Sequence, residues 1–98
     1  MKINISSVHF KADQKLEDFI KEKVNKLAST YEDIIGGEIT LRLDNSSNME
    51  NKITEIRLKV PGNDLFAKKQ CKSFEEATDV ALKALRKQLN RHKEKIRP

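Results

Sequence analysis

The spacing of hydrophobic residues divides the chain into six predicted elements. From Lys2 to Ser7 the apolar residues Ile3 and Ile5 occupy alternate positions, which predicts a first strand that extends to Val8. From Asp13 to Thr30 the apolar spacing changes to 3.6 residues, which predicts an amphipathic helix with Asp13 as its N-cap. Gly36 and Gly37 are expected to end this region. The predicted buried stripe of the helix comprises Leu16, Phe19, Ile20, Val24, Leu27 and Tyr31.

Three further strands follow in the pattern. Ile39, Leu41 and Leu43 alternate with polar residues, and the polar run from Asn45 to Asn51 is expected to be a loop. The next strand repeats the pattern and is followed by Pro61-Gly62-Asn63-Asp64, whose turn chemistry predicts a hairpin to a fourth strand, 65–72. In the third strand Ile56, Leu58 and Val60 should face inward, whereas Thr54, Glu55, Arg57 and Lys59 should lie on the outer face of the sheet.

A second helix is predicted from Ser73, which is a suitable N-cap followed by two acids in the first turn. At 100° per residue, one side of this helix is apolar and the other is cationic. The apolar side should comprise Phe74, Ala77, Ala81, Leu82, Ala84, Leu85, Leu89, His92 and Ile96. The cationic side should carry Lys83, Arg86, Lys87, Arg91 and Lys95.

The resulting order, β-α-β-β-β-α, predicts an α+β fold. We expect a four-stranded, largely antiparallel sheet with both helices packed on one face, as in double-stranded RNA-binding domains. A chain of 98 residues fits one domain, 1–98, with a modest core. Apolar residues make up 37% and charged residues 36%, which describes a folded but very polar domain.

Positive charge is concentrated at the C-terminal end of the chain. Residues 80–98 carry seven cations and one acid, a net charge of +6, whereas the whole chain carries +5. After Asp79 the second helix almost lacks the Glu–Lys pairs that ordinary surface helices use, so its cations repel one another. Lys23, with Lys26, lies at the apolar stripe of the first helix and is expected to face a groove between the helices. The alternative readings are a merely solvated charged face and snorkelling of Lys23.

Several function classes find no support in the sequence. No apolar run is long enough to span a bilayer, and the lone Cys71 agrees with a reducing compartment, so we expect a cytoplasmic protein without membrane contact. His9 and His92 show no metal-ligand spacing, and there is no phosphate-binding Gly-rich loop or nucleophile motif. We therefore expect no enzyme activity, no cofactor, no metal and no small-molecule substrate. His92 is expected to be a packing or groove residue, with an RNA contact as the alternative.

A rigid helix bearing Lys and Arg side chains suits contacts to phosphates, with strongly salt-dependent affinity. Nothing resembles a base-reading recognition helix, which favours a shaped, structured RNA over sequence-specific DNA. The outer-face positions Thr54, Glu55, Arg57 and Lys59 include no aromatic residue, so base stacking on the sheet is not supported. Binding is expected to use the helices.

Two segments carry a resemblance to a known family. Residues 16–27 (LEDFIKEKVNKL) and 85–95 (LRKQLNRHKEK) are similar to the first and closing helices of the ribosome hibernation promoting factor and ribosome-associated inhibitor family, in its short, single-domain form. The resemblance implies a protein that binds the small ribosomal subunit, occupies the mRNA channel and tRNA sites, and inactivates and preserves ribosomes in stationary phase or stress. We expect it to be a monomer when it is off the ribosome. By motif match, the 16S rRNA-contacting cations are Lys23, Lys26, Lys87, Arg91, Lys93 and Lys95; charge geometry alone adds Lys83 and Arg86.

The chain departs from the family pattern before its last helix. The family commonly has Asp-x-Tyr-x-Ala-Ile-Asp there, whereas this chain reads SFEEATD over 73–79 and keeps only Ala77 and Asp79 of those positions. Phe74 is expected to supply the packing instead. Two other functions stay open at this stage. One is a general binder of structured, double-stranded RNA, and the other is a protein-interaction adaptor that uses the outer sheet face.

Overall fold

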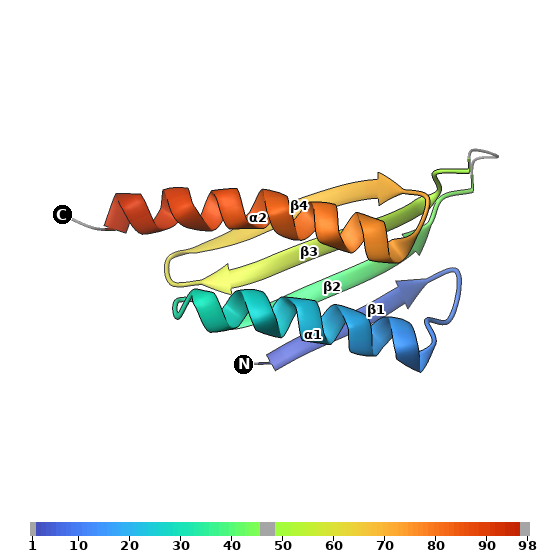
Figure 1. Ribbon diagram of the computed structural model, residues 1–98, viewed down its shortest axis with the longest axis horizontal. Coiled ribbons are helices and arrows are strands. Elements are labelled where there is room, and N and C mark those ends of the chain that lie inside the picture. The colour runs from blue at the N-terminus through green and yellow to red at the C-terminus, as the bar shows by residue number, and fades with distance from the viewer. Residues whose placement is uncertain (1, 46–48, 97–98) are drawn as a thin grey trace.

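The structure is a computed structural model that describes residues 2–45 and 49–96, with side chains described through residue 92. Four strands and two helices follow one another in the predicted order (Figure 1). Their bounds are β1 Lys2–Val8, α1 Gln14–Thr30, β2 Gly36–Leu43, β3 Lys52–Val60, β4 Asn63–Cys71 and α2 Phe74–Ile96. The predicted order and α+β class are thereby confirmed.

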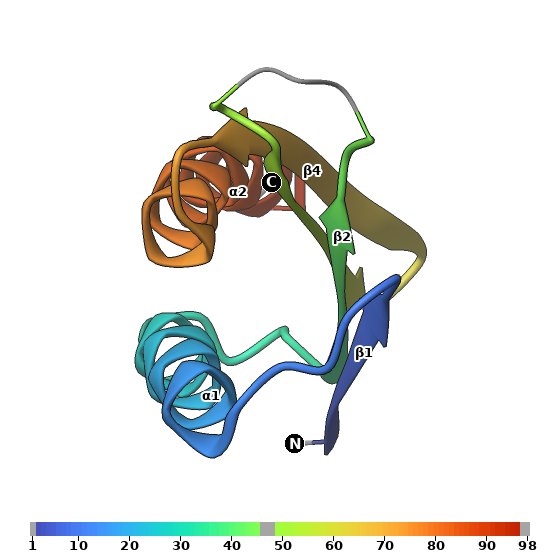
Figure 2. The same ribbon diagram turned by 90° about the vertical axis from the view of Figure 1, so that its right-hand side faces the viewer.

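The strands form one sheet in the order β1-β2-β3-β4, and both helices lie on the same face of it (Figure 2). β1 pairs in parallel with β2 because α1 carries the chain back across the sheet between them, whereas β2–β3 and β3–β4 are antiparallel. A two-residue turn joins β3 to β4, with Val60 paired to Asn63. Gly62 has φ +80, which glycine adopts without strain, and Pro61 before it fixes the entry to the turn.

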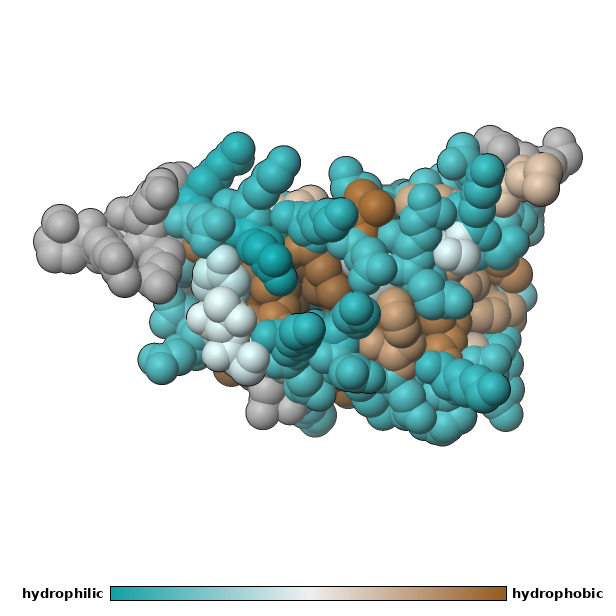
Figure 3. All heavy atoms as spheres, in the orientation of Figure 1, coloured by the Kyte–Doolittle hydropathy of each residue, from teal (hydrophilic) through white to brown (hydrophobic). Residues whose placement is uncertain are grey.

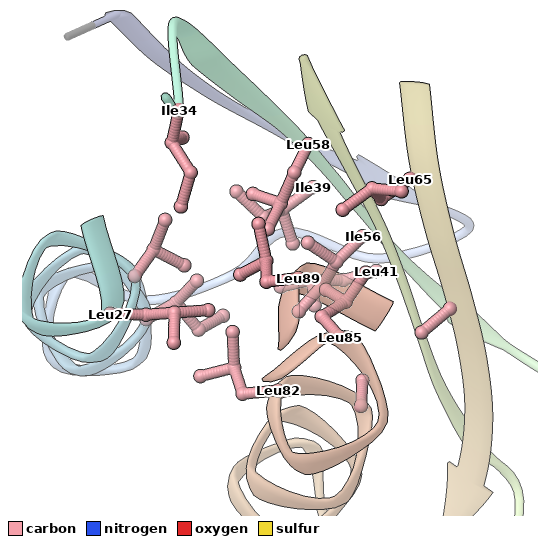
Figure 4. Close-up of a cluster of buried hydrophobic side chains, with 14 of the residues drawn as sticks. Leu27, Ile34, Ile39, Leu41, Ile56, Leu58, Leu65, Leu82, Leu85 and Leu89 are labelled. Carbon is pink, nitrogen blue, oxygen red and sulfur yellow. The ribbon is translucent and has the colours of Figure 1, made fainter. Parts of the chain in front are cut away.

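The core lies between the sheet and the two helices (Figure 4). Ile20 and Leu85, from the two helices, and Ile56 from the sheet are fully buried. Gly37 adjoins this core, where a Cβ would meet Leu58 Cδ2 at 3.4 Å, an ordinary van der Waals distance. The other buried hydrophobic residues of β2, β3, β4 and the two helices include Val24, Leu27, Ile39, Leu41, Leu58, Leu65, Ala67, Ala81, Leu82 and Leu89.

Both predicted N-caps are confirmed. The Asp13 carboxylate accepts a hydrogen bond from Leu16 N at 2.8 Å, and the Ser73 hydroxyl accepts one from Glu76 N at 3.1 Å. Each satisfies an amide that has no partner inside its helix. The departure from the family pattern at 73–79 therefore leaves a well-formed helix start. Phe74 is buried and stacks on Phe10, with ring centroids 4.8 Å apart.

The structure corrects three details of the sequence-based prediction. Gly36 and Gly37 do not end the first region; they begin β2 and pair with the start of β1. Thr54 is fully buried on the helix side, where its hydroxyl lies 3.4 Å from that of Thr78, because the period of two that buries Ile56 buries position 54 as well. β4 begins at Asn63, and its Phe66 is 44% exposed on the outer face. Of the predicted loop 45–51, residues 46–48 lie outside the described residues.

Candidate nucleic-acid interface

A groove of about 320 Å³ runs between α1 and α2 on the face opposite the solvent-exposed side of the sheet. In Figure 3, which views this face, hydrophobic atoms appear at the bottom of a furrow bordered by hydrophilic side chains. Leu27 and Leu82 lie in the groove and are 2% and 9% exposed, so they form an apolar floor. We call this feature the interhelical groove; it is lined by Lys23, Lys26, Leu27, Asp79, Leu82, Lys83 and Arg86.

Helix α1 contributes two of the predicted cations to the interhelical groove. Lys23 is half-buried, and its Nζ lies 5.5 Å from the centroid of the Phe19 ring. This cation–π contact and the packing of its stem hold the ammonium at the groove edge. Lys26, one turn further along, is exposed. The predicted groove position of both lysines is therefore confirmed.

Helix α2 carries the remaining predicted cations. Lys83 and Arg86, which were predicted from charge geometry alone, line the interhelical groove and are exposed. Lys87 and Arg91 are exposed too, but they lie outside the groove lining. The backbone of Lys93 and Lys95 belongs to α2, and their side chains lie outside the described part. The structure thus brings four of the eight predicted residues together in one groove.

The two faces of the molecule hold their charges differently. On the outer sheet face, Lys59 pairs with Glu38 at 3.2 Å and Arg57 with Asp64 at 3.7 Å, and Arg42 contacts Glu55 at 3.4 Å. Among the side chains that the structure describes, no carboxylate lies within 4 Å of a groove cation's nitrogen. The groove cations are therefore free to bind an external anion, whereas the outer face largely neutralises itself.

His92 lies at the far end of the helix pair, beside a hollow of about 370 Å³ that also contacts Tyr31 and Leu89. Its Nε2 is buried without a hydrogen-bond partner among the described residues. The prediction that His92 sits on the inner side of α2 is confirmed. Nearby, the Tyr31 hydroxyl donates to Asn90 Oδ1 at 2.6 Å and ties the end of α1 to α2. Sequence reasoning missed this link, because 59 residues separate its partners.

Besides the groove, three features of the described chain bear on function: its potential metal ligands, its cysteine and the apolar character of its helices. Residues 2–45 and 49–92 contain no group of three His, Cys, Asp or Glu side chains that could hold a metal ion. Burial, with Glu76 and Glu50 adding to it, raises the pKa of the Cys71 thiol, which disfavours the reactive thiolate. Within residues 2–45 and 49–96, no helix has the length and apolar character that crossing a bilayer requires.

The outer sheet face contains an aromatic residue that was not among the positions predicted for that face. Phe66 on β4 stands beside Arg57, whose guanidinium carbon lies 5.6 Å from the ring centroid. A single aromatic ring covered by its own cation, with ion pairs around it, differs from the open aromatic platform on which sheet-type RNA binders stack bases. The geometry therefore favours the helix face over the sheet as the candidate nucleic-acid interface.

Comparisons with known proteins agree with this architecture. The family model described as Sigma 54 modulation protein / S30EA ribosomal protein matches residues 3–97. The ribosome hibernation promoting factor of Pseudomonas putida is 28% identical over 95 residues, which is 97% of this chain and 89% of that protein.

Two solved structures share the fold. A ribosomal subunit interface protein from Coxiella burnetii superposes with a TM-score of 0.84 at 19% identity. The match covers 96% of this chain and 99% of the Coxiella chain. The N-terminal domain of Thermus thermophilus Protein Y superposes with a TM-score of 0.79 at 18% identity. The match covers 94% of this chain and 99% of that domain. Because the family model spans nearly the whole sequence, the chain belongs to the Sigma 54 modulation protein / S30EA ribosomal protein family.

Proposed function

We propose that this protein is a non-enzymatic, ribosome-binding hibernation factor of the cytoplasm. It binds 16S rRNA of the small subunit through its helix face, occupies the mRNA channel and tRNA sites, and thereby keeps idle ribosomes inactive. The observation that carries the proposal is the interhelical groove, where four cations without carboxylate partners among the described side chains face outward from two rigid helices. Membership of the family and the similarity to the Pseudomonas ribosome hibernation promoting factor support the ribosome as the partner.

The physical basis of binding is electrostatic and geometric. Four groove cations, with Lys87 and Arg91 beyond them, form a row of donors along both helices. Such donors bind phosphate oxygens without reading sequence, and their fixed spacing on helices selects a surface of matching shape. A folded rRNA pocket supplies phosphates in fixed positions, which favours it over a flexible single strand. The protein acts as an occluding body and needs no reactive group.

Sedimentation of ribosomes in sucrose gradients tests the proposal directly. The protein should co-migrate with 30S and 70S particles at about 150 mM salt and should lower poly(U)-directed translation in a purified system. A charge-reversed variant, Lys26→Glu with Arg86→Glu, should lose both effects. The matched control, Lys59→Glu with Arg57→Glu on the outer sheet face, should retain them, because those positions lie on the opposite side of the sheet.

Competition decides between this function and a general binder of double-stranded RNA. If arbitrary RNA duplexes displace the protein from 30S subunits at equal concentration of sites, the hibernation proposal is wrong and the general binder is favoured. If the outer-face variant loses ribosome binding while the groove variant keeps it, the protein is an adaptor that uses its sheet. Failure of the unmodified protein to enter any ribosomal fraction rejects ribosome binding altogether.

A further inference from the structure

One carboxylate interrupts the cationic lining of the interhelical groove. Asp79 on α2 is exposed within this groove, next to four cations. No ion pair within 4 Å and no hydrogen bond involves its carboxylate among the described side chains. The acids of the outer sheet face behave otherwise, since Glu38, Glu55 and Asp64 each contact a cation. The Asp79 oxygens are therefore available to an external donor.

A groove built solely to hold phosphate gains nothing from a carboxylate, because like charges repel. Asp79 supplies what the lysines and arginine cannot, since Lys and Arg side chains are donors without acceptors. The feature it can recognise is a group that presents hydrogen-bond donors between two phosphates. In RNA such donors belong to the edges of unpaired bases, which proteins read when the bases are splayed from the stack.

The floor and size of the groove fit one base. Leu27 and Leu82 are only 2% and 9% exposed, so they leave a narrow apolar strip at the bottom of the groove that a base can contact. The groove volume of about 320 Å³ lies at the small end of ligand pockets, which range from about 300 to 1,000 Å³. A duplex is far too wide for it, whereas a single nucleotide can enter while its flanking phosphates stay at the rim near Lys26 and Lys83.

We propose that the interhelical groove seats one unpaired guanine nucleotide of the bound RNA, with Asp79 as the residue that determines base specificity. The base rests on Leu27 and Leu82, and its N1–H and N2–H donate to the two carboxylate oxygens of Asp79. Guanine alone of the four bases presents two adjacent donors on this edge. Adenine and cytosine place an acceptor beside their amino group, and uracil flanks its N–H with carbonyls. This inference rests on the proposed function, because it specifies the RNA contact of the same surface.

Short single-stranded RNAs test the inference without the ribosome. The heptamers UUUGUUU, UUUAUUU and UUUUUUU, and a fourth with inosine at the centre, are titrated at about 50 mM salt with the unmodified protein, Asp79→Asn and the control Glu75→Gln. Glu75 is an exposed acid on the same helix and outside the interhelical groove, so both substitutions remove one negative charge. Methyl NMR signals of Leu27 and Leu82 report whether the base enters the groove.

The unmodified protein should bind the guanine heptamer about tenfold more tightly than the adenine or all-uracil heptamer, as expected for one bidentate pair. Inosine, which keeps N1–H and lacks the amino group, should fall between them. Asp79→Asn should abolish the preference, Glu75→Gln should keep it, and both leucine methyl signals should shift with guanine RNA.

Three results would overturn the inference. Equal affinity of the unmodified protein for all heptamers, or binding of none of them up to 1 mM, removes the guanine seat. A uniform gain in affinity for every heptamer in Asp79→Asn shows that Asp79 acts through charge alone. The proposed function fails separately, since it is judged by co-sedimentation of the unmodified protein with ribosomes. A protein that co-sediments normally but ignores the central base refutes the specificity role and leaves ribosome binding in place.

Discussion

The salt dependence of ribosome binding should reveal which cations touch phosphate. We take a double variant of the interhelical groove, Lys26→Gln with Arg86→Gln, and a matched variant of the outer sheet face, Lys59→Gln with Arg57→Gln. Each loses one lysine and one arginine charge, so both have the same net charge. They differ in surroundings: the outer-face cations are paired with carboxylates, whereas the groove cations contact none among the described side chains.

The expected magnitude follows from counting the cations of the helix face. The four groove cations with Lys87 and Arg91 give six contacts, and each phosphate contact adds about 0.7 to 0.9 to the slope of log affinity against log salt. The unmodified protein should therefore show a slope of about −4 to −5, and its affinity should fall about 300- to 1,000-fold between 50 and 200 mM salt. Two lost contacts reduce the slope to about −3 to −3.5, so the fall shrinks to about 50- to 150-fold.

Fluorescence anisotropy with labelled protein and purified 30S subunits, at four salt concentrations, measures these slopes. The groove variant should bind more weakly at low salt and with the smaller slope, and the outer-face variant should keep the slope of the unmodified protein. Equal slopes for the two variants would refute the reasoning, because binding would then depend on net charge and not on the helix face. A larger loss in the outer-face variant would place the interface on the sheet.

Three further predictions concern the fold and its cysteine. Leu85→Ala removes a fully buried side chain and should lower the free energy of unfolding by about 2 to 5 kcal/mol, seen as a fall of roughly 10 °C or more in Tm; a fall of 2 °C would contradict the tight core. Asp13→Ala deletes the cap on Leu16 N and should cost about 1 kcal/mol in urea unfolding, while Asp13→Asn should cost less. Cys71 should react with iodoacetamide more slowly than free cysteine at pH 8, since burial raises its pKa, and Glu76→Gln should accelerate the reaction; an unchanged rate would exclude the Glu76 contribution.

The sequence predicted the element order because the helices and the first three strands show a hydrophobic period and a strong turn signal precedes the fourth strand. The helices repeat apolar residues at 3.6 and the strands at 2, and both caps are short-range signals that need no tertiary knowledge. The start of β2 was not predicted because Gly36 and Gly37 have no side chains that could contribute to a hydrophobic period. Although its position has the same register as the buried Ile56, Thr54 was predicted on the outer face because threonine is polar. Its burial is tolerated through the hydroxyl of Thr78, a partner 24 residues away.

The candidate site was predicted less completely than the fold. Charge spacing correctly placed Lys23 and Lys26 beside the cations of α2, since one face of each helix must meet the sheet and the adjoining edges must meet each other. The same reasoning gave Asp79 no role. A single acid in a helix is ordinary, and only the packing of α1 against α2 shows that it faces cations from both helices. The position of Asp79 relative to these cations depends on how the two helices pack together. The hydrophobic period of a single helix carries no information about that packing.

The charge arrangement of α2 includes repulsion between neighbouring cations. Lys83, Lys87 and Arg91 follow one another at i,i+4, and each such like-charge neighbour destabilises a helix by about 0.2 to 0.5 kcal/mol. The buried Leu85 and Leu89 on the opposite side each contribute about 1.5 to 3 kcal/mol, so the helix can carry this repulsion and stay folded. On the outer sheet face, by contrast, the chain places an acid beside each of Arg42, Arg57 and Lys59. If the helix face binds rRNA as proposed, the polyanion supplies the missing negative charge, and part of the binding free energy is the relief of repulsion already present in the free protein.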